Sequence, residues 1–173
     1  MSNARNLANL LGTSTTIPSG NLPSGSLVQQ KQMNLTTTDE VDQSASTYAD
    51  LTGGSMSYTP KASGNLLVID SCVHFYINNA ATNGWSGATH RCVVDGTAKA
   101  REGGGTSLYG LAIRDDDGSR SSGMFYDLQN CTHTTTGTSA ITIYLQTYAI
   151  LKLDYISANQ YANGYLRVME FAG

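Results

Sequence analysis

The chain has 173 residues, which is enough for one domain with a sizeable core. Its formal net charge is −3 and its ten lysines and arginines are scattered, which excludes a protein that binds nucleic acid through a basic surface. Hydrophobic residues make up 40% of the chain, too many for a disordered protein, and no apolar run approaches the roughly 20 residues of a membrane span.

The first 25 residues differ in pattern from the rest of the chain. Ser2 is a suitable helix N-cap, leucines and alanines then recur at helical spacing, and Gly12 is a suitable helix end. Residues 13–25 hold two prolines and many small polar residues, which predicts an extended arm. We expect this arm to dock on a partner, because so short a helix is marginal alone; a frayed terminus is the alternative. The predicted docking side chains are Leu7, Leu10, Leu11, Ile17 and Leu22.

Residues 26–173 are predicted to form one domain of short strands. Gly (18), Ser (18) and Thr (20) are abundant and charged residues make up only 13%, a mixture that favours strands and turns over helices. Apolar residues alternate most clearly in Leu66–Ile77, and Asp95–Gly96 indicates a hairpin turn. Cys131–Gly137 is predicted to be a threonine-rich loop. The predicted strands are 26–34, 47–51, 54–59, 66–77, 85–94, 107–113, 122–128, 140–148, 151–156 and 165–172.

These elements predict an all-β fold, an antiparallel β-sandwich or jelly roll of about eight to ten strands with a short N-terminal helix. The strands over 140–148 and 165–172 also carry aromatic or apolar side chains on both faces. A strand that is apolar on both faces is typical of a central sandwich strand or of a subunit interface, so we expect an oligomer; the alternative is that these side chains line one core. The predicted interface residues are Tyr144, Tyr148, Tyr165, Met169 and Phe171.

Cysteine and histidine occur in pairs two residues apart. Side chains at this spacing point to the same side of a strand, and both are zinc ligands, but the tight-turn spacing of zinc motifs is absent. We therefore expect no metal, and we expect the cysteines to serve as small apolar residues. Their odd number and synthesis in a cytosol predict that they are reduced. The pairs are Cys72-x-His74, His90-x-Cys92 and Cys131-x-His133.

No catalytic motif rises above background. Asp115–Gly118 lacks the spacing of a calcium loop, Arg101–Gly105 lacks the end of a phosphate-binding loop, and a Gly-x-Ser-x-Gly nucleophile motif is absent. We predict a non-enzymatic protein with no catalytic residue and no cofactor. A small hydrolase of the cell envelope, using a Cys–His site or paired carboxylates, is kept as an alternative.

Several segments resemble structural proteins of tailed phages, especially marine and cyanobacterial ones. The stretch Ala4–Pro23 resembles the opening of such proteins most specifically. The turn and strand over Pro60–Phe75, the turn Val94–Gly96 and the late strands Thr138–Gln146 and Tyr165–Phe171 are similar to their core strands more loosely. The resemblance thus covers most of the chain discontinuously.

This resemblance implies a homotrimeric jelly-roll head, similar in outline to complement-like and tumour-necrosis-factor-like trimers, that is anchored to the virion by its N-terminal arm. It implies a virion location after synthesis in the host cytoplasm, and a partner such as the major capsid protein or a tail or fibre adaptor. The absence of a long shaft favours a capsid decoration (cement) protein. The alternative is a tail-fibre or head-fibre tip that binds a host receptor or glycan through loops 78–87, 98–106 and 115–121, with Trp85 stacking on sugar.

Overall fold

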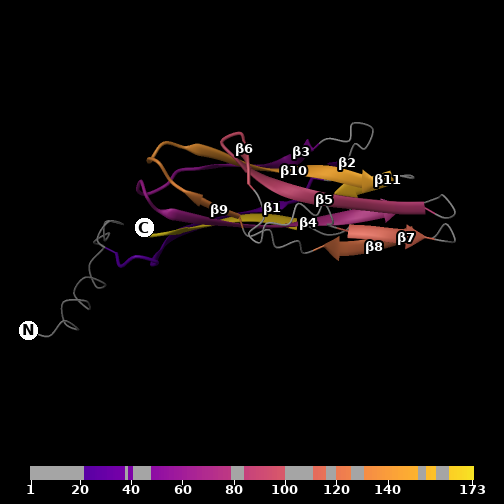
Figure 1. Cartoon of the computed structure of the whole chain (residues 1–173), viewed down its shortest axis with the longest axis horizontal. Coiled ribbons are helices and arrows are strands. Elements are labelled where there is room, and N and C mark those ends of the chain that lie inside the picture. The colour runs from indigo at the N-terminus through magenta and orange to yellow at the C-terminus, as the bar shows by residue number, and fades with distance from the viewer. Residues whose placement is uncertain are drawn as a thin grey trace, which may run out of the picture.

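A computed structural model shows two packed layers of strands (Figure 1). The predicted helix and the predicted docking residues Leu7, Leu10, Leu11 and Ile17 lie outside the described residues. The structure describes residues 22–37, 39–40, 48–78, 84–99, 111–115, 120–125, 131–151, 155–158 and 164–173.

Twelve strands lie in the described parts, and every pairing between them is antiparallel. The seven-stranded sheet holds β1 (Leu27–Leu35), β2 (Asp39–Glu40), β4 (Leu66–Asn78), β8 (Arg120–Phe125), β9 (Cys131–Thr134), β11 (Tyr155–Ala158) and β12 (Gly164–Phe171). The five-stranded sheet holds β3 (Ala49–Tyr58), β5 (Gly84–Val94), β6 (Thr97–Ala98), β7 (Leu111–Asp115) and β10 (Ile141–Leu151).

The strand order is that of a jelly roll. One sheet runs β1-β12-β4, with β9 and β8 following one another along the other side of β4, and the second runs β3-β10-β5, with β6 and β7 beyond β5. Along the chain, the long strands β1, β3, β4 and β5 alternate between the sheets, and β9, β10 and β12 do so again. This double-sheet arrangement confirms the predicted antiparallel sandwich or jelly roll. The strand count exceeds the predicted range partly because β2 and β6 are two-residue pairings.

The core lies between the sheets, where the period-two pattern places it. On β4, Leu67, Ile69, Val73 and Phe75 are at most 1% exposed, as the alternation over 66–77 predicted. The inward side chains of β10 and β12 complete the layer: Ile143, Leu145, Leu166 and Val168. The β4 residues that alternate with these point away from this core, and several of them, including Asp70 and Cys72, are buried as well.

Two predictions about single elements are wrong. The predicted threonine-rich loop begins as a strand, β9, because its residues pair with the first half of β4, Cys131 opposite Ile69. The two predicted strands 47–51 and 54–59 are one strand, β3. A β-bulge lies between the two predicted segments, marked by a register shift against β10 and by Gly53 at φ +72°.

The hairpin turn after β5 is confirmed. Asp95 and Gly96 both have positive φ, +47° and +74°, as a two-residue turn of this kind requires. The Asp95 N–H donates to the Thr142 carbonyl at 2.9 Å, and Asp95 Oδ1 accepts from the Thr142 N–H at 3.1 Å. These bonds fix the turn to β10, which offsets the strain of a non-glycine residue at positive φ.

Candidate functional site

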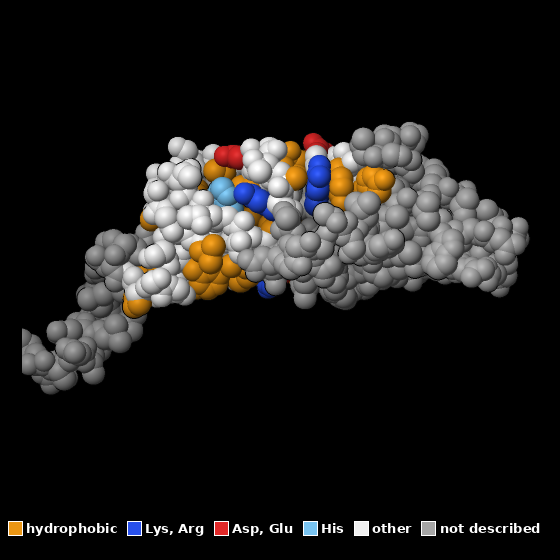
Figure 2. Space-filling view, in the orientation of Figure 1, with side chains coloured by type: hydrophobic (Ala, Val, Ile, Leu, Met, Phe, Trp, Pro, Cys, Tyr) orange, Lys and Arg blue, Asp and Glu red, His pale blue; other side chains and the backbone are white. Residues whose placement is uncertain are grey.

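An exposed apolar row crosses the outer face of the seven-stranded sheet. Leu27 on β1, Phe171 on β12 and Leu66 on β4 are register partners on three adjacent strands. Leu27 is 53% exposed and Leu66 is 39% exposed, the large hydrophobic side chains most open to solvent in the described part of the chain. The pair Met169 and Val68, both half-buried, lies in the next row. Figure 2 shows hydrophobic side chains gathered at this end of the described surface.

The rim of this apolar row is polar. Thr134 and Thr132 of β9 are opposite Leu66 and Val68 on one side, and Gln30 of β1 is opposite Met169 on the other. Apolar side chains framed by polar ones are the pattern of a protein contact surface. We name Leu27, Leu66, Val68, Met169 and Phe171 the outer apolar patch.

An ion pair lies on the same face, further along β4 and β12. Arg167 pairs with the buried carboxylate of Asp70, and the Tyr165 hydroxyl donates to both Asp70 oxygens at 3.3 Å. Burial, and then the Asp70 charge, raise the pKa of Tyr165, so this hydroxyl stays protonated and able to donate. The outer face therefore passes from an apolar end to a charged middle.

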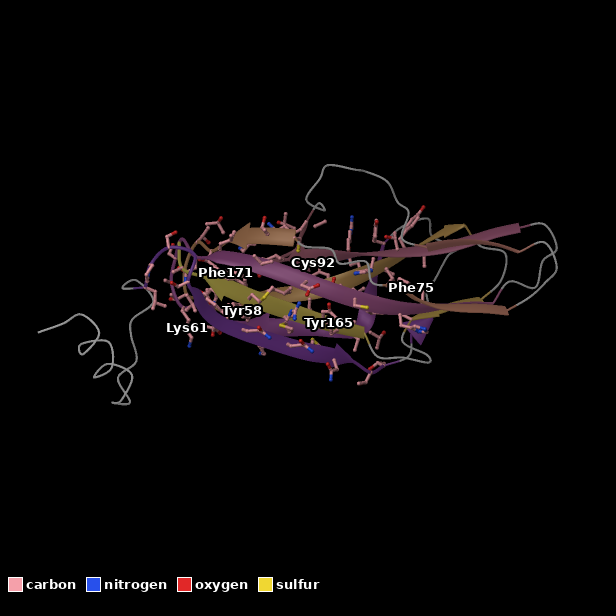
Figure 3. The ribbon with its side chains drawn as sticks, turned by 90° about the horizontal axis from the view of Figure 1, so that it is seen from below. Tyr58, Lys61, Phe75, Cys92, Tyr165 and Phe171 are labelled. Carbon is pink, nitrogen blue, oxygen red and sulfur yellow. The ribbon has the colours of Figure 1, made fainter. Side chains whose placement is uncertain are left out.

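Beneath the apolar end, a buried carboxylate links four segments. Glu170 is fully buried, and its Oε2 accepts from Gln29 Nε2 at 2.6 Å and from the Tyr58 hydroxyl at 2.9 Å. Its Oε1 accepts from Asn65 Nδ2 at 2.6 Å and from the Lys61 N–H at 2.8 Å. Figure 3 labels Tyr58, Lys61 and Phe171 together at this end of the sandwich. The carboxylate thus ties β1, β3 and the turn before β4 to β12.

The hydrogen bonds decide the charge state of Glu170. Burial alone would raise the pKa of this carboxyl, but the bonds from Asn65, Gln29, Lys61 and Tyr58 outweigh burial and hold the pKa below its ordinary value. The same cluster, with burial as the largest cause, raises the pKa of the Tyr58 hydroxyl. At neutral pH the cluster therefore holds one carboxylate and one protonated phenol.

The chain enters and leaves the sandwich at this end. The Gly25 N–H donates to the Ala172 carbonyl at 2.8 Å, and the Ala172 N–H donates to the Ser26 carbonyl at 2.8 Å. Leu22, the one predicted docking residue that is described, is half-buried just before this junction. Residues 1–21 are therefore joined to the domain directly beside the paired strands β1 and β12.

The two sheets are also bridged along one edge. β1 and β3 are each an end strand in the strand order of their sheets. Lys31 Nζ donates to the Ser57 carbonyl at 2.8 Å and Gln29 Nε2 donates to the Thr59 carbonyl at 2.9 Å. Side chains of β1 thus occupy one carbonyl near the end of β3 and one just after it, and these two carbonyls are not free to pair with a further strand.

The structure separates the predicted interface residues into two groups. Tyr165, Met169 and Phe171 lie on the outer face of the seven-stranded sheet, the last two within the outer apolar patch. Tyr144 and Tyr148 lie on the outer face of the five-stranded sheet, where the Tyr148 ring packs on Tyr48 at 5.2 Å between centroids. These residues therefore do not form one surface in a single chain.

The cysteine–histidine pairs separate in a similar way. Cys92 and Cys131 approach each other in the core, whereas Cys72 lies on the other face of β4. Burial lowers the pKa of His74 and of His133, so both are neutral near pH 7. No three histidine, cysteine, aspartate or glutamate side chains gather as a metal site within the described residues.

A serine–histidine pair lies in the interior. Ser71 Oγ and His90 Nε2 are 3.1 Å apart, a distance that a hydrolytic dyad would use. Both side chains are buried, at 0% exposure, and the His90 ring lies 6.4 Å from the Phe75 ring. A substrate has no path to this pair in the folded sandwich, so the contact serves to satisfy a buried imidazole.

A polar hollow of about 260 Å³ lies at the end of the sandwich, between the Asp95 turn and the segment that follows β9. Its lining is mostly hydroxyl, carboxylate and imidazole groups. These groups suit hydrogen bonds to a hydroxylated ligand such as a sugar. The lining residues are Pro60, Asp95, His133, Thr135, Thr136, Gly137, Ser139, Ala140 and Ile141.

No protein-family model matches the chain, and no curated protein matches its sequence. Among solved structures, the chain is similar to the crystal structure of the infectious bursal disease virus VP2 subviral particle, with 18% identity and a TM-score of 0.39 over 86% of this chain and 34% of that one. A structure of the Gx strain of the same virus gives 16% identity and a TM-score of 0.36 over 83% and 34%. The chain thus spans 34% of the length of each.

The sequence analysis did not predict the Glu170 cluster, although the sequence contains a signal for it. Leu166, Val168 and Glu170 share the inward face of the last strand, so an acidic side chain stands at a core position. An acid at such a position needs several hydrogen-bond donors. Its donors come from parts of the sequence as distant as Gln29, which no local pattern connects to it.

The structure describes no helix that is long and apolar enough to cross a membrane.

Proposed function

We propose that this chain is a non-enzymatic virion structural protein that assembles as a homotrimer through the outer face of its seven-stranded sheet. The observation that carries this proposal is the outer apolar patch. It presents five apolar side chains in two register-aligned rows, with the two most exposed ones, Leu27 and Leu66, at its two sides. Exposed apolar rows on a sheet face are costly in a monomer and become favourable when a second surface covers them.

The proposal assigns the docking role to residues 1–25, as the resemblance to tailed-phage proteins implies. The junction at Gly25 and Ala172 supports this role, because the arm leaves the domain beside the strand that the Glu170 cluster anchors. Three arms per trimer would multiply the affinity for a capsid through effective concentration. A decoration protein on the capsid is the form that we propose, with the major capsid protein or a fibre adaptor as partner.

The arm is tested by removing it. Particles of the virus that encodes the chain, stripped of this protein, are mixed with the full chain and with a chain lacking residues 1–25, and sedimented. We expect the full chain to sediment with the particles, and we expect the shortened chain to stay in solution with an unchanged solution mass. Equal sedimentation of both chains would contradict the docking role of the arm.

A second function, binding of a host glycan by a fibre tip, has one observation in its favour. The polar hollow near Asp95 offers hydroxyl, carboxylate and imidazole groups at one end of the sandwich. Binding of the full chain to host-surface polysaccharide, lost in Asp95→Ala and kept in Asp50→Ala, would favour this function. No binding to polysaccharide by the intact chain would remove it.

A further inference from the structure

We propose that Cys92 and Cys131 form a reversible disulfide that links the two sheets of the sandwich. Cys92 lies on β5 of the five-stranded sheet and Cys131 lies on β9 of the seven-stranded sheet. Both are thiols in this structure. The inference rests on these two side chains and their surroundings, and it does not depend on the proposed function.

The register turns both thiols toward the same interior. Cys92 is opposite Leu145 of β10, and Cys131 is opposite Ile69 of β4, and all four side chains belong to the core between the sheets. Cys92 is 0% exposed and Cys131 is 1% exposed, and a hydrogen bond joins the two thiols. A disulfide requires β-carbons roughly 3.5–4.5 Å apart, a separation that two thiols hydrogen-bonded between facing strands can reach through local movement of those strands. Figure 3 marks Cys92 among the side chains of the described strands.

The charges around the pair favour one order of reaction. The hydrogen bond with Cys92 is the main cause that lowers the pKa of the Cys131 thiol, and the nearby Lys99 ammonium lowers it further. The same hydrogen bond, followed by burial, raises the pKa of the Cys92 thiol. Cys131 is therefore the thiol that ionises first, and the thiolate is the form that attacks a disulfide.

The step balances with a disulfide oxidant such as oxidised glutathione. The Cys131 thiolate attacks one sulfur of the oxidant, which breaks its S–S bond, forms a mixed disulfide and releases one glutathione thiolate. Cys92 then loses its proton, attacks the Cys131 sulfur and releases the second glutathione. The protein loses two protons and two electrons, and the oxidant becomes two thiols. Because both sulfurs are buried, we expect slow oxidation that requires local opening of the strands.

The experiment uses the intact full chain. It is incubated with oxidised or with reduced glutathione, free thiols are alkylated, and the protein is digested with trypsin without reduction. Cleavage after Lys61, Arg91, Lys99, Arg120 and Lys152 places each cysteine in a different peptide, namely residues 62–91, 92–99 and 121–152. We expect a cross-linked species that joins peptides 92–99 and 121–152 and lacks the mass of two hydrogen atoms. Peptide 62–91 should remain alkylated at Cys72.

The oxidised chain should also be more stable. A link that closes a loop of this length raises Tm by roughly 10 °C for a domain of this size, and added reductant should reverse the rise. The matched control Cys72→Ala should keep both the cross-link and the rise in Tm, whereas Cys131→Ala should lose both.

Peptide mapping of the unmutated chain tests the Cys92–Cys131 disulfide even if Cys131→Ala fails to fold. An oxidised chain in which Cys92 and Cys131 both remain alkylated, or in which either is joined to Cys72, would overturn the proposal. An oxidised chain with the expected cross-link but an unchanged Tm would overturn its role as a link between the sheets.

Discussion

Glu170 is the residue on which the end of the sandwich beside Gly25 and Ala172 depends most. Its two oxygens accept four hydrogen bonds from β1, β3 and the turn before β4. In Glu170→Gln an amide N–H₂ would face donors that now meet a carboxylate, and at least one buried donor would lose its partner. We expect a loss of about 3 kcal/mol in the free energy of unfolding, measured with urea.

The control for this change is Asp50→Asn, the same exchange at an exposed carboxylate that accepts from Gln146 at 2.7 Å. We expect the control to change the free energy of unfolding by less than about 0.5 kcal/mol. A similar loss in both variants would show that the Glu170 cluster contributes no more than a surface contact.

The same residue predicts a pH dependence. The pKa of Glu170 is lower in the folded than in the unfolded chain, so the unfolded chain binds more protons in the window between the two values. The stability that Glu170 contributes is complete above its unfolded pKa of about 4.3 and is lost as the pH falls below it. The difference between the unfolding free energies of the unmutated chain and Glu170→Gln should therefore shrink between neutral pH and about pH 3. A difference that stays constant would contradict the lowered pKa.

At the scale of elements, local patterns predicted those strands whose two faces differ. The buried face of β4 follows from the alternation of Leu67, Ile69, Val73 and Phe75 alone, and the turn at Asp95 follows from its own dipeptide. β9 has no such signal, because a threonine run with one buried cysteine becomes a strand only against the partner β4. The outer apolar patch is likewise a product of register, since Leu27, Phe171 and Leu66 are far apart in sequence.

The bulge in β3 gives a prediction for this element. Gly53 has φ +72°, and a β-carbon there would lie 2.7 Å from Thr37 Oγ1. Gly53→Ala should therefore lower the free energy of unfolding through both backbone strain and crowding, by about 2 kcal/mol. Gly64→Ala, at φ +86° with open space around it, measures the strain alone and should cost about 1 kcal/mol. Equal losses in the two variants, measured by urea unfolding, would show that the contact with Thr37 adds nothing.

At the scale of the whole molecule, the proposed assembly combines the jelly-roll body, its outer apolar patch and the proposed docking arm of residues 1–25. The Glu170 cluster and the bridging side chains Gln29 and Lys31 hold the strands that carry the patch. The patch itself contributes little to the monomer, because Leu27 and Leu66 are open to solvent. A charge placed there should therefore act on assembly and leave the fold unchanged.

The opposite face offers a matched control. Ser55 is exposed on the outer face of the five-stranded sheet, where it is the register partner of Tyr144. Leu66→Asp places a carboxylate on the proposed interface, and Ser55→Asp places the same carboxylate on the face that holds the other predicted interface residues. Ser55→Asp should unfold within about 0.5 kcal/mol of the unmutated chain, because its site is not buried. Leu66→Asp should stay folded and lose only the stability that assembly adds, so that its unfolding no longer depends on protein concentration.

Assembly through the outer apolar patch is tested by the solution mass of the full chain and of these two variants, measured by light scattering after gel filtration. We expect three times the chain mass of 18.4 kDa for the unmutated chain and for Ser55→Asp, and the mass of one chain for Leu66→Asp. A monomeric unmutated chain, or a trimer that Ser55→Asp dissociates and Leu66→Asp does not, would contradict assembly through the outer apolar patch.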